Sequence, residues 1–241
     1  MYEPQAKFGR LRAPDINDRR FMLSPPASAL NVVSKYHFTD LVIDQGETSA
    51  CVGAASRGWL SAGPVRNMSG PSWWDIYTAG QAVDEWPGAE PAYYGTSVRA
   101  AFKVLKAQGF VKSYNWAFDL DTAINHILTV SPMCLGTIWT TDMMRPDKEG
   151  FIHVGGRAVG GHAYLAIGAN RSAKCPDGSL GAVRIVNSWG KGWGQNGRAW
   201  ISFKDLDTLI KDDGEACAAV EAKAPATRSV EPPVMTMQTY D

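Results

Sequence analysis

Two side chains near position 50 are suited to acyl-transfer chemistry. Gln45 lies six residues before Cys51, and the residues between them, 46–50, are small or polar. A cysteine thiolate is a strong nucleophile, and a side-chain amide can donate a hydrogen bond to the oxyanion that forms when a carbonyl is attacked. The pair therefore predicts a thiol-dependent site, provided that a base lies elsewhere in the chain.

Two later segments supply a base and a group that orients it. His162 follows two glycines at the start of a predicted strand, and Asn187 ends another predicted strand just before Trp189. An imidazole takes the thiol proton and later protonates the leaving amine, while an amide fixes the plane of the ring. Trp189 is expected to shield the hydrogen bond between His162 and Asn187 from water. Cys51 opens a predicted helix, where unpaired N–H groups stabilise a thiolate.

Each of these residues also has an ordinary structural interpretation. A cysteine in a helix is usually a buried small hydrophobe, and His162, Asn187 and Gln45 could each be a turn or helix-start residue. The order Gln, Cys, His, Asn, with glycines beside three of them, favours the catalytic interpretation. The remaining histidines lack such surroundings and are assigned to structure or surface: His37, His126 and His153.

The three motif blocks resemble those of papain-family cysteine peptidases, in the style of the shortened bacterial and phage-type members. The resemblance covers about residues 41–205. It implies an endopeptidase with nucleophile Cys51, base His162, orienting residue Asn187 and oxyanion donor Gln45. It also implies substrate contacts, with the peptide backbone at Gly95 and Thr96, a carbonyl near the scissile bond at Gly161, and the second side-chain pocket at Val98. From Val98 we expect that pocket to accept an apolar side chain two positions upstream of the bond cut.

The sequence departs from the family pattern at two positions beside the nucleophile. Thr48 stands where most members have a disulfide cysteine, and Val52 replaces the usual aromatic residue. The interval from Cys51 to His162 is also shorter than the separation of about 130 residues that is usual for the family, so we expect trimmed loops. The fold then depends on packing and not on a disulfide bridge.

The spacing of hydrophobic residues, together with glycine, proline and capping residues at segment ends, predicts an α+β fold with helices first and strands second. Helices are predicted at residues 51–62, 72–82, 97–108 and 121–128, the last capped by Asp121. Strands are predicted at residues 133–139, 163–167, 182–186 and 198–203. The arrangement predicts a two-lobed papain-like catalytic domain over residues 41–215. Its helical lobe covers about residues 45–128, its antiparallel, barrel-like β lobe covers about residues 130–215, and the active site lies in the cleft between them.

The two ends of the chain differ from this domain in composition. Residues 1–40 are predicted to form an extended arm, distinguished by the apolar and proline run at residues 20–26. Two alternatives are open for the arm: a prosegment-like inhibitor of the cleft, or a structural strap. Residues 216–241 are rich in Ala, Glu, Lys, Pro and Thr and are predicted to be a polar, extended tail that can dock on a protein partner or an assembly.

Composition restricts the possible partners. Lys plus Arg and Asp plus Glu number 24 each, so net charge does not draw the protein to nucleic acid or to an anionic membrane. We expect a protein or peptide substrate and no cofactor or metal, because no pair of cysteines has metal-ligand spacing. Without a recognisable signal peptide, we expect a cytoplasmic, non-classically exported or particle-associated protein. Two other classes stay open: a catalytically idle or structural relative that binds a partner, and a thiol acyltransferase or peptidoglycan hydrolase.

Overall fold

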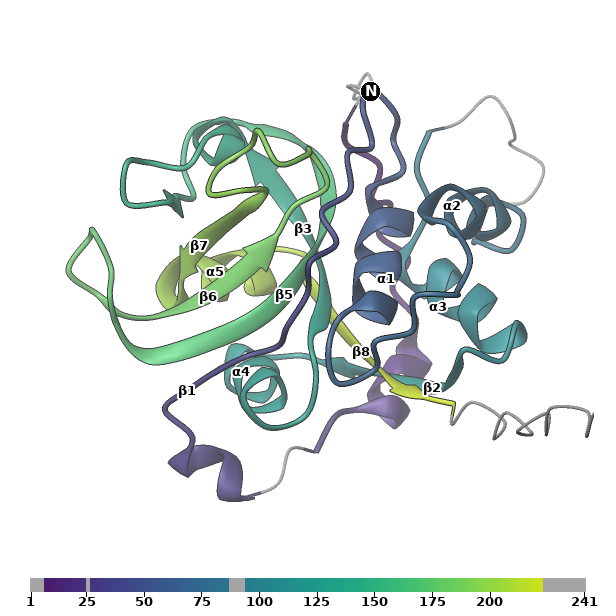
Figure 1. The fold of residues 1–241 in the computed structure, drawn as a ribbon, viewed down its shortest axis with the longest axis horizontal. Coiled ribbons are helices and arrows are strands. Elements are labelled where there is room, and N and C mark those ends of the chain that lie inside the picture. The colour runs from purple at the N-terminus through teal and green to yellow at the C-terminus, as the bar shows by residue number, and fades with distance from the viewer. Residues whose placement is uncertain (1–6, 25–26, 87–93, 223–241) are drawn as a thin grey trace, which may run out of the picture.

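Helices and sheet lie side by side in the computed structural model, which describes residues 7–24, 27–86 and 94–222. Figure 1 shows three helices gathered on one side: α1 (Cys51–Ser61), α2 (Trp73–Gln81) and α3 (Val98–Ala107). Most of the strands occupy the other side, together with α4 (Leu120–Thr129) and α5 (Phe203–Lys211), whereas β2 (Val111–Ala117) lies on the helical side, below α3. The predicted α+β layout of two halves is confirmed.

The strands form one open sheet in the order β2-β8-β3-β5-β6-β7-β4, with β1 paired to β5 off this path. Their bounds are β1 Ser34–Tyr36, β2 Val111–Ala117, β3 Met133–Thr140, β4 Phe151–Ile152, β5 Ala158–Lys174, β6 Leu180–Val186, β7 Arg198–Ser202 and β8 Glu215–Glu221. Neighbouring strands are antiparallel, except that β4 and β7 are parallel. The predicted antiparallel sheet is present, and it is open, because within the described residues the two ends of the path do not pair.

All four predicted helices are present, and three of them, α2, α3 and α4, start at a side-chain cap. Ser72 and Asp75 form a capping box at the start of α2, and the Ser97 side chain accepts from the Ala100 N–H at the start of α3. At α4, Asp119 accepts from the Thr122 N–H, so the predicted cap at Asp121 is wrong by two residues. The helix α5 was not expected.

The sequence between residues 203 and 221 differs most from expectation. Residues 216–221 are not part of a free tail but belong to β8, which lies between β2 and β3. Figure 1 shows this strand running from the sheet toward the helical side, where it meets β2. Ala216, Cys217 and Ala218 are buried there, because neighbouring strands on both sides satisfy the backbone and cover the small side chains. Residues 223–241 lie outside the described residues, so docking of the tail stays a prediction.

The first 40 residues are not extended throughout. Two short 3-10 helices, η1 (Ile16–Phe21) and η2 (Ala27–Asn31), precede β1, which already belongs to the sheet. A third, η3 (Thr141–Met144), follows β3. In the run at residues 20–26, the Leu23 N–H donates to the Trp116 carbonyl of β2, and Pro25 and Pro26 lie outside the described residues.

The helix that carries the predicted nucleophile is buried along its whole length. Every residue of α1 is buried, and Trp59 is only 1% exposed. Gly53 permits this packing, because a Cβ added there would lie 2.2 Å from the Trp73 carbonyl oxygen of α2. On its other side Gly58 faces the Leu165 side chain of β5. The helix is therefore clamped between α2 and the sheet, which fixes the position of its first residue.

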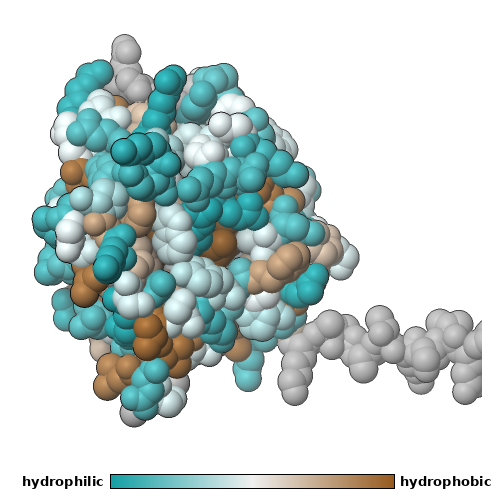
Figure 2. Space-filling model, turned by 60° about the vertical axis from the view of Figure 1, so that its left-hand side comes forward, coloured by the Kyte–Doolittle hydropathy of each residue, from teal (hydrophilic) through white to brown (hydrophobic). Residues whose placement is uncertain are grey.

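The described residues contain no helix with the length and apolar character needed to span a bilayer. On the face seen in Figure 2, hydrophobic residues appear in small groups between hydrophilic ones. The apolar material is instead concentrated in two large interior clusters, one around the sheet and α4, the other between α1, α3 and the sheet.

Candidate active site

Cys51 is the first residue of α1 and is completely buried. The preceding Ala50 makes no side-chain cap, so the first turn of the helix keeps backbone N–H groups that are free to interact with the sulfur. Burial raises the pKa of the Cys51 thiol to about 11, while backbone hydrogen bonds from Ala163, Gly9 and Val52 act in the opposite direction. In this arrangement Cys51 is a neutral thiol at neutral pH.

His162 and Asn187 form the expected pair. The His162 Nε2 lies 2.8 Å from the Asn187 Oδ1, which also accepts a hydrogen bond of 2.7 Å from the Ser188 N–H. Because an amide oxygen only accepts, Nε2 carries the proton and the lone pair of His162 sits on Nδ1. His162 lies within β5 and not at the start of a strand, because pairing with β3 extends β5 back to Ala158. The N–H of Ala163, the next residue, hydrogen-bonds Cys51, which places Cys51 beside this part of β5.

Aromatic rings enclose the His162 imidazole. The ring centroid lies 4.8 Å from that of Trp139, 5.0 Å from that of Trp189 and 5.8 Å from that of Phe8. Trp189 therefore lies where it was expected, against the hydrogen-bonded pair. Burial lowers the pKa of His162 to about 4, with weaker opposing contributions from Asn187 and the Lys7 backbone. Its Nδ1 is buried and makes no hydrogen bond of good geometry within the described residues.

Gln45 is held in place by hydrogen bonds on both sides of its amide. Its Oε1 accepts from the Ser188 Oγ at 2.5 Å, and its backbone N–H donates to the Ser188 carbonyl at 2.9 Å. Its Nε2 donates to the Thr48 carbonyl at 2.6 Å and points its other hydrogen toward the Lys7 carbonyl at 3.4 Å. The amide is therefore held in one orientation, and its second hydrogen faces the Lys7 carbonyl of the N-terminal arm.

Residues 7–12 of the N-terminal arm occupy the cleft. The Gly9 and Arg10 N–H groups donate to the Gly161 carbonyl at 3.1 and 3.0 Å. On the opposite wall, the Thr96 N–H donates to the Gly9 carbonyl at 2.9 Å, and the Leu11 N–H donates to the Thr96 carbonyl at 3.0 Å. The arm thus uses the backbone groups that the resemblance assigns to substrate.

Two glycines let the arm approach this closely. Gly95 has a φ of 101°, and a Cβ added there would lie 2.3 Å from the Gly9 carbonyl oxygen. A Cβ at Gly161 would lie 2.2 Å from the Arg10 carbonyl oxygen. Both positions therefore require glycine for a peptide backbone to pass. Val98, the remaining predicted substrate contact, is buried in the apolar cluster of the helical side, so its role in a pocket stays a prediction.

The arm is anchored by charged residues that the sequence analysis did not single out. Arg10 and Arg12 pair with Asp213 and Glu215 at the start of β8. The sequence does contain a signal for this contact. Arg10 and Arg12 are two positions apart, as are Asp213 and Glu215, and side chains two positions apart lie on the same face of an extended strand. The contact was not predicted, because residues from 216 onward were assigned to a tail and strand β8 was therefore missed.

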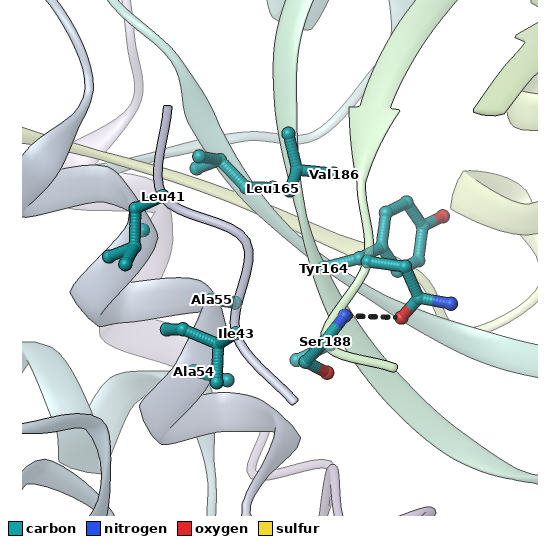
Figure 3. A pocket seen from close by; sticks show the side chains of 11 residues that line it. Leu41, Ile43, Ala54, Ala55, Tyr164, Leu165, Val186 and Ser188 are labelled. Carbon is teal, nitrogen blue, oxygen red and sulfur yellow. Dashed lines mark hydrogen bonds between the residues drawn. The ribbon is translucent and has the colours of Figure 1, made fainter. Parts of the chain in front are cut away.

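A small, mainly apolar cavity lies between α1 on the helical side and strands β5 and β6 of the sheet. Figure 3 shows Leu41 and Ile43 from the segment before Gln45 facing Ala54 and Ala55 of α1, with Tyr164 and Val186 on the strands opposite. The Gly190 N–H donates to the Ile43 carbonyl at 3.0 Å. This packing ties Gln45, the helix and the strand bearing Asn187 to one another. Within the described residues no group of three or more His, Cys, Asp or Glu side chains is placed to hold a metal ion.

No family model and no curated protein matches the sequence. Solved structures do match the fold. Xylellain, a cysteine protease from Xylella fastidiosa, is 18% identical with a TM-score of 0.69, over 92% of this chain and 99% of that one. Procathepsin B from Trypanosoma congolense is 11% identical with a TM-score of 0.61, over 89% and 87%. Bromelain from Ananas comosus, solved with the E64 inhibitor, is 12% identical with a TM-score of 0.58, over 78% and 99%. The chain therefore has the fold of the papain-family cysteine proteases.

Proposed function

We propose that the protein is a cysteine endopeptidase. The observation that carries the proposal is the constellation itself: a cysteine at a helix start, a histidine hydrogen-bonded to an asparagine at 2.8 Å, and an oriented glutamine amide. These residues come from four separate segments, and two further contacts support a common site: the Ala163 N–H hydrogen-bonds Cys51, and the Ser188 hydroxyl donates to the Gln45 amide. A purely structural role would not require the glutamine amide to be aligned with the other three.

In the proposed reaction, His162 takes the Cys51 proton, and the resulting thiolate attacks the carbonyl carbon of a peptide bond. The oxyanion accepts hydrogen bonds from the Gln45 amide and from the backbone at the start of α1. The imidazolium then donates its proton to the leaving amine, and an acyl-enzyme remains. A water molecule, deprotonated by His162, attacks the thioester and releases the acid. Asn187 keeps the imidazole in plane throughout.

The arm accounts for latency in the same proposal. With residues 7–12 in the cleft, a substrate cannot reach Thr96 or Gly161, and both reacting groups are neutral. Displacement of the arm admits water to Cys51 and His162, which removes the desolvation that keeps them uncharged. We assign the arm as an inhibitory segment for this reason. The alternative of a structural strap predicts no gain of activity when the arm is weakened.

Labelling with an epoxysuccinyl inhibitor tests the nucleophile. The full chain with Arg10→Ala, which removes ion pairs that anchor the arm, is incubated with the inhibitor, digested and mapped by mass spectrometry, with Arg10→Ala/Cys51→Ala as control. We expect the label on Cys51 alone. The other three cysteines are also buried but lie away from the constellation: Cys134, Cys175 and Cys217. A label on one of these in folded protein would remove the assignment.

Products from a random peptide library distinguish the classes of thiol enzyme. An endopeptidase cleaves internal peptide bonds of the library, whereas a peptidoglycan hydrolase acts on muropeptides and an acyltransferase joins amines to its products. An idle relative reacts with none of these and leaves Cys51 unlabelled.

A further inference from the structure

One carboxylate in the occupied cleft has no partner outside the arm. Glu215 Oε1 lies 3.0 Å from Arg10 Nε, and its Oε2 lies 3.4 Å from Arg12 Nη1. The side chains of Arg10 and Glu215 are only 1% and 5% exposed. The Arg10 guanidinium also donates to the Asp213 carbonyl at 2.7 Å. Glu215 is thus a buried anion whose direct ion pairs, among the described residues, both come from the arm.

The surroundings of this pair form a socket for a guanidinium. Glu215 on β8 is the register partner of Gly136 on β3, and Gly136 is in turn the partner of Ala163, next to His162. A Cβ added at Gly136 would lie 2.9 Å from both Arg10 Nε and Glu215 Oε1. The missing side chain therefore makes the space that the Arg10 head group fills. Any side chain at this position would collide with the ion pair.

Removing the arm would leave this socket with an uncompensated charge. Taking a carboxylate out of water is costly unless a cation is hydrogen-bonded to it. Arg99 contributes at longer range, but its own hydrogen bonds go to Asp18 and to the Ala13 carbonyl. Burial raises the pKa of Glu215, and the arginines oppose the shift. Without Arg10 and Arg12 the carboxylate becomes hydrated or protonated, and a cationic ligand from outside would restore the ion pair.

The backbone contacts locate the socket relative to the reacting atoms. Phe8 lies against His162, and the Gly9 backbone reaches Cys51. Arg10 follows, and it is paired with Thr96 on the wall to which the acyl part of a substrate is assigned. Arg10 pairs with Thr96 in the parallel sense. A peptide that binds along the same wall in the opposite, antiparallel sense has its residues upstream of the cleaved bond on this side, and its second upstream residue lies at the position of Arg10.

We propose that Glu215 is the specificity-determining residue of this site and that it selects peptides with arginine or lysine at the second position upstream of the bond cut. The proposal rests on the endopeptidase function proposed above. It replaces the sequence-based expectation of an apolar side chain at this position. That expectation considered only the residues near His162 and Val98, whereas the acidic group comes from β8.

The test uses the full chain with Arg10→Ala, which weakens the arm without removing any part of the fold. Three fluorogenic peptide amides are compared that differ only at the second position, which is arginine, its neutral isostere citrulline, or leucine. We expect kcat/KM for the arginine peptide to exceed that for the citrulline peptide by about 10- to 100-fold, the value of a hydrogen bond to a charged group. Glu215→Gln in the same background should reduce this ratio to near one. Glu221→Gln, an exposed change on the same strand, should leave the ratio intact.

Equal cleavage of the arginine and citrulline peptides by the Arg10→Ala protein would overturn the proposal, as would a ratio that Glu215→Gln does not change. If Glu215→Gln does not fold, the arginine-to-citrulline ratio of the Arg10→Ala protein decides alone. If no peptide is cleaved and Cys51 is not alkylated, the endopeptidase function has failed instead. Calorimetric binding of the same peptides to Arg10→Ala/Cys51→Ala then decides on the socket: tighter binding of the arginine peptide supports it, and equal affinity refutes it.

Discussion

Replacing Arg10 by alanine in the full chain should release the proposed peptidase from its own arm. Arg10 makes the most buried contacts of residues 7–12, with its side chain 1% exposed and its guanidinium bound to Glu215 and to the Asp213 carbonyl. The substitution removes these contacts but keeps the backbone hydrogen bonds to Gly161 and Thr96. The arm therefore stays attached but binds the cleft more weakly.

The magnitude follows from the charged hydrogen bonds that are lost. A hydrogen bond to a charged group contributes about 1.5–3 kcal/mol, which corresponds to a shift of about 10- to 150-fold in the equilibrium between closed and open arm. The closed state also loses the cation beside Glu215, which moves the effect toward the upper end of this range. If the closed state dominates in the wild type, the observed rate rises by the same factor, because only open molecules bind substrate.

The assay measures the rate of Cys51 alkylation by an epoxysuccinyl inhibitor and the hydrolysis of a short fluorogenic peptide. Arg20→Ala is the matched control, since Arg20 is an exposed arginine of the same segment that lies in η1. Thermal unfolding shows whether each variant stays folded. A folded Arg10→Ala protein with the rates of the wild type would refute the inhibitory role of the arm. Loss of fold without a gain in rate would identify a strap.

Substitutions and pH should reveal the roles within the site. Cys51→Ala and His162→Ala should abolish turnover in the Arg10→Ala background, and turnover without His162 would exclude the mechanism. Gln45→Ala should lower kcat by roughly 100- to 1,000-fold, as expected for one of two oxyanion donors, and Asn187→Ala should cost less because the imidazole remains. The free energy of unfolding should decrease as the pH is lowered from about 6.5 toward 4. The pKa of His162 is about 4 in the folded protein and 6.5 in the unfolded chain, so the unfolded chain binds more protons in this range. Denaturant titrations at pH 7 and pH 5 measure this decrease. If His162→Gln leaves the difference in unfolding free energy between the two pH values unchanged, the prediction is wrong.

The segments that carry the candidate site residues could be located from the sequence because their signals are local. Cys51 follows a polar segment and opens an apolar run, and capping residues such as Ser72 and Ser97 mark helix starts within a few positions. Local chemistry also explains the error at α4. Two aspartates stand near its start, and only the backbone conformation determines that Asp119 and not Asp121 accepts from the first turn.

The central position of β8 could not be predicted from residues 215–221. Its alternating pattern is weak because Ala216, Cys217 and Ala218 are all buried, and small side chains carry little β propensity. The strand exists because β2 and β3 provide hydrogen-bonding partners on both sides. Since Glu215 is the first residue of β8, missing the strand also meant missing the acidic group beside the cleft.

In the proposed function, the contacts of the arm explain why inhibition and substrate selection would involve the same residues. An inhibitor that is part of the chain must bind at the substrate's own hydrogen-bonding groups, because these are the groups that the cleft leaves unsatisfied. The arm satisfies them at Gly161 and Thr96 and supplies the cation that Glu215 requires. By covering Cys51 and His162 it also keeps both groups neutral, so the closed state lacks the charges needed for attack. A basic peptide that displaces the arm therefore restores the Glu215 ion pair and admits the water that favours the thiolate–imidazolium pair. A substrate without a cation admits the water but does not restore the Glu215 ion pair, so it competes less well with Arg10.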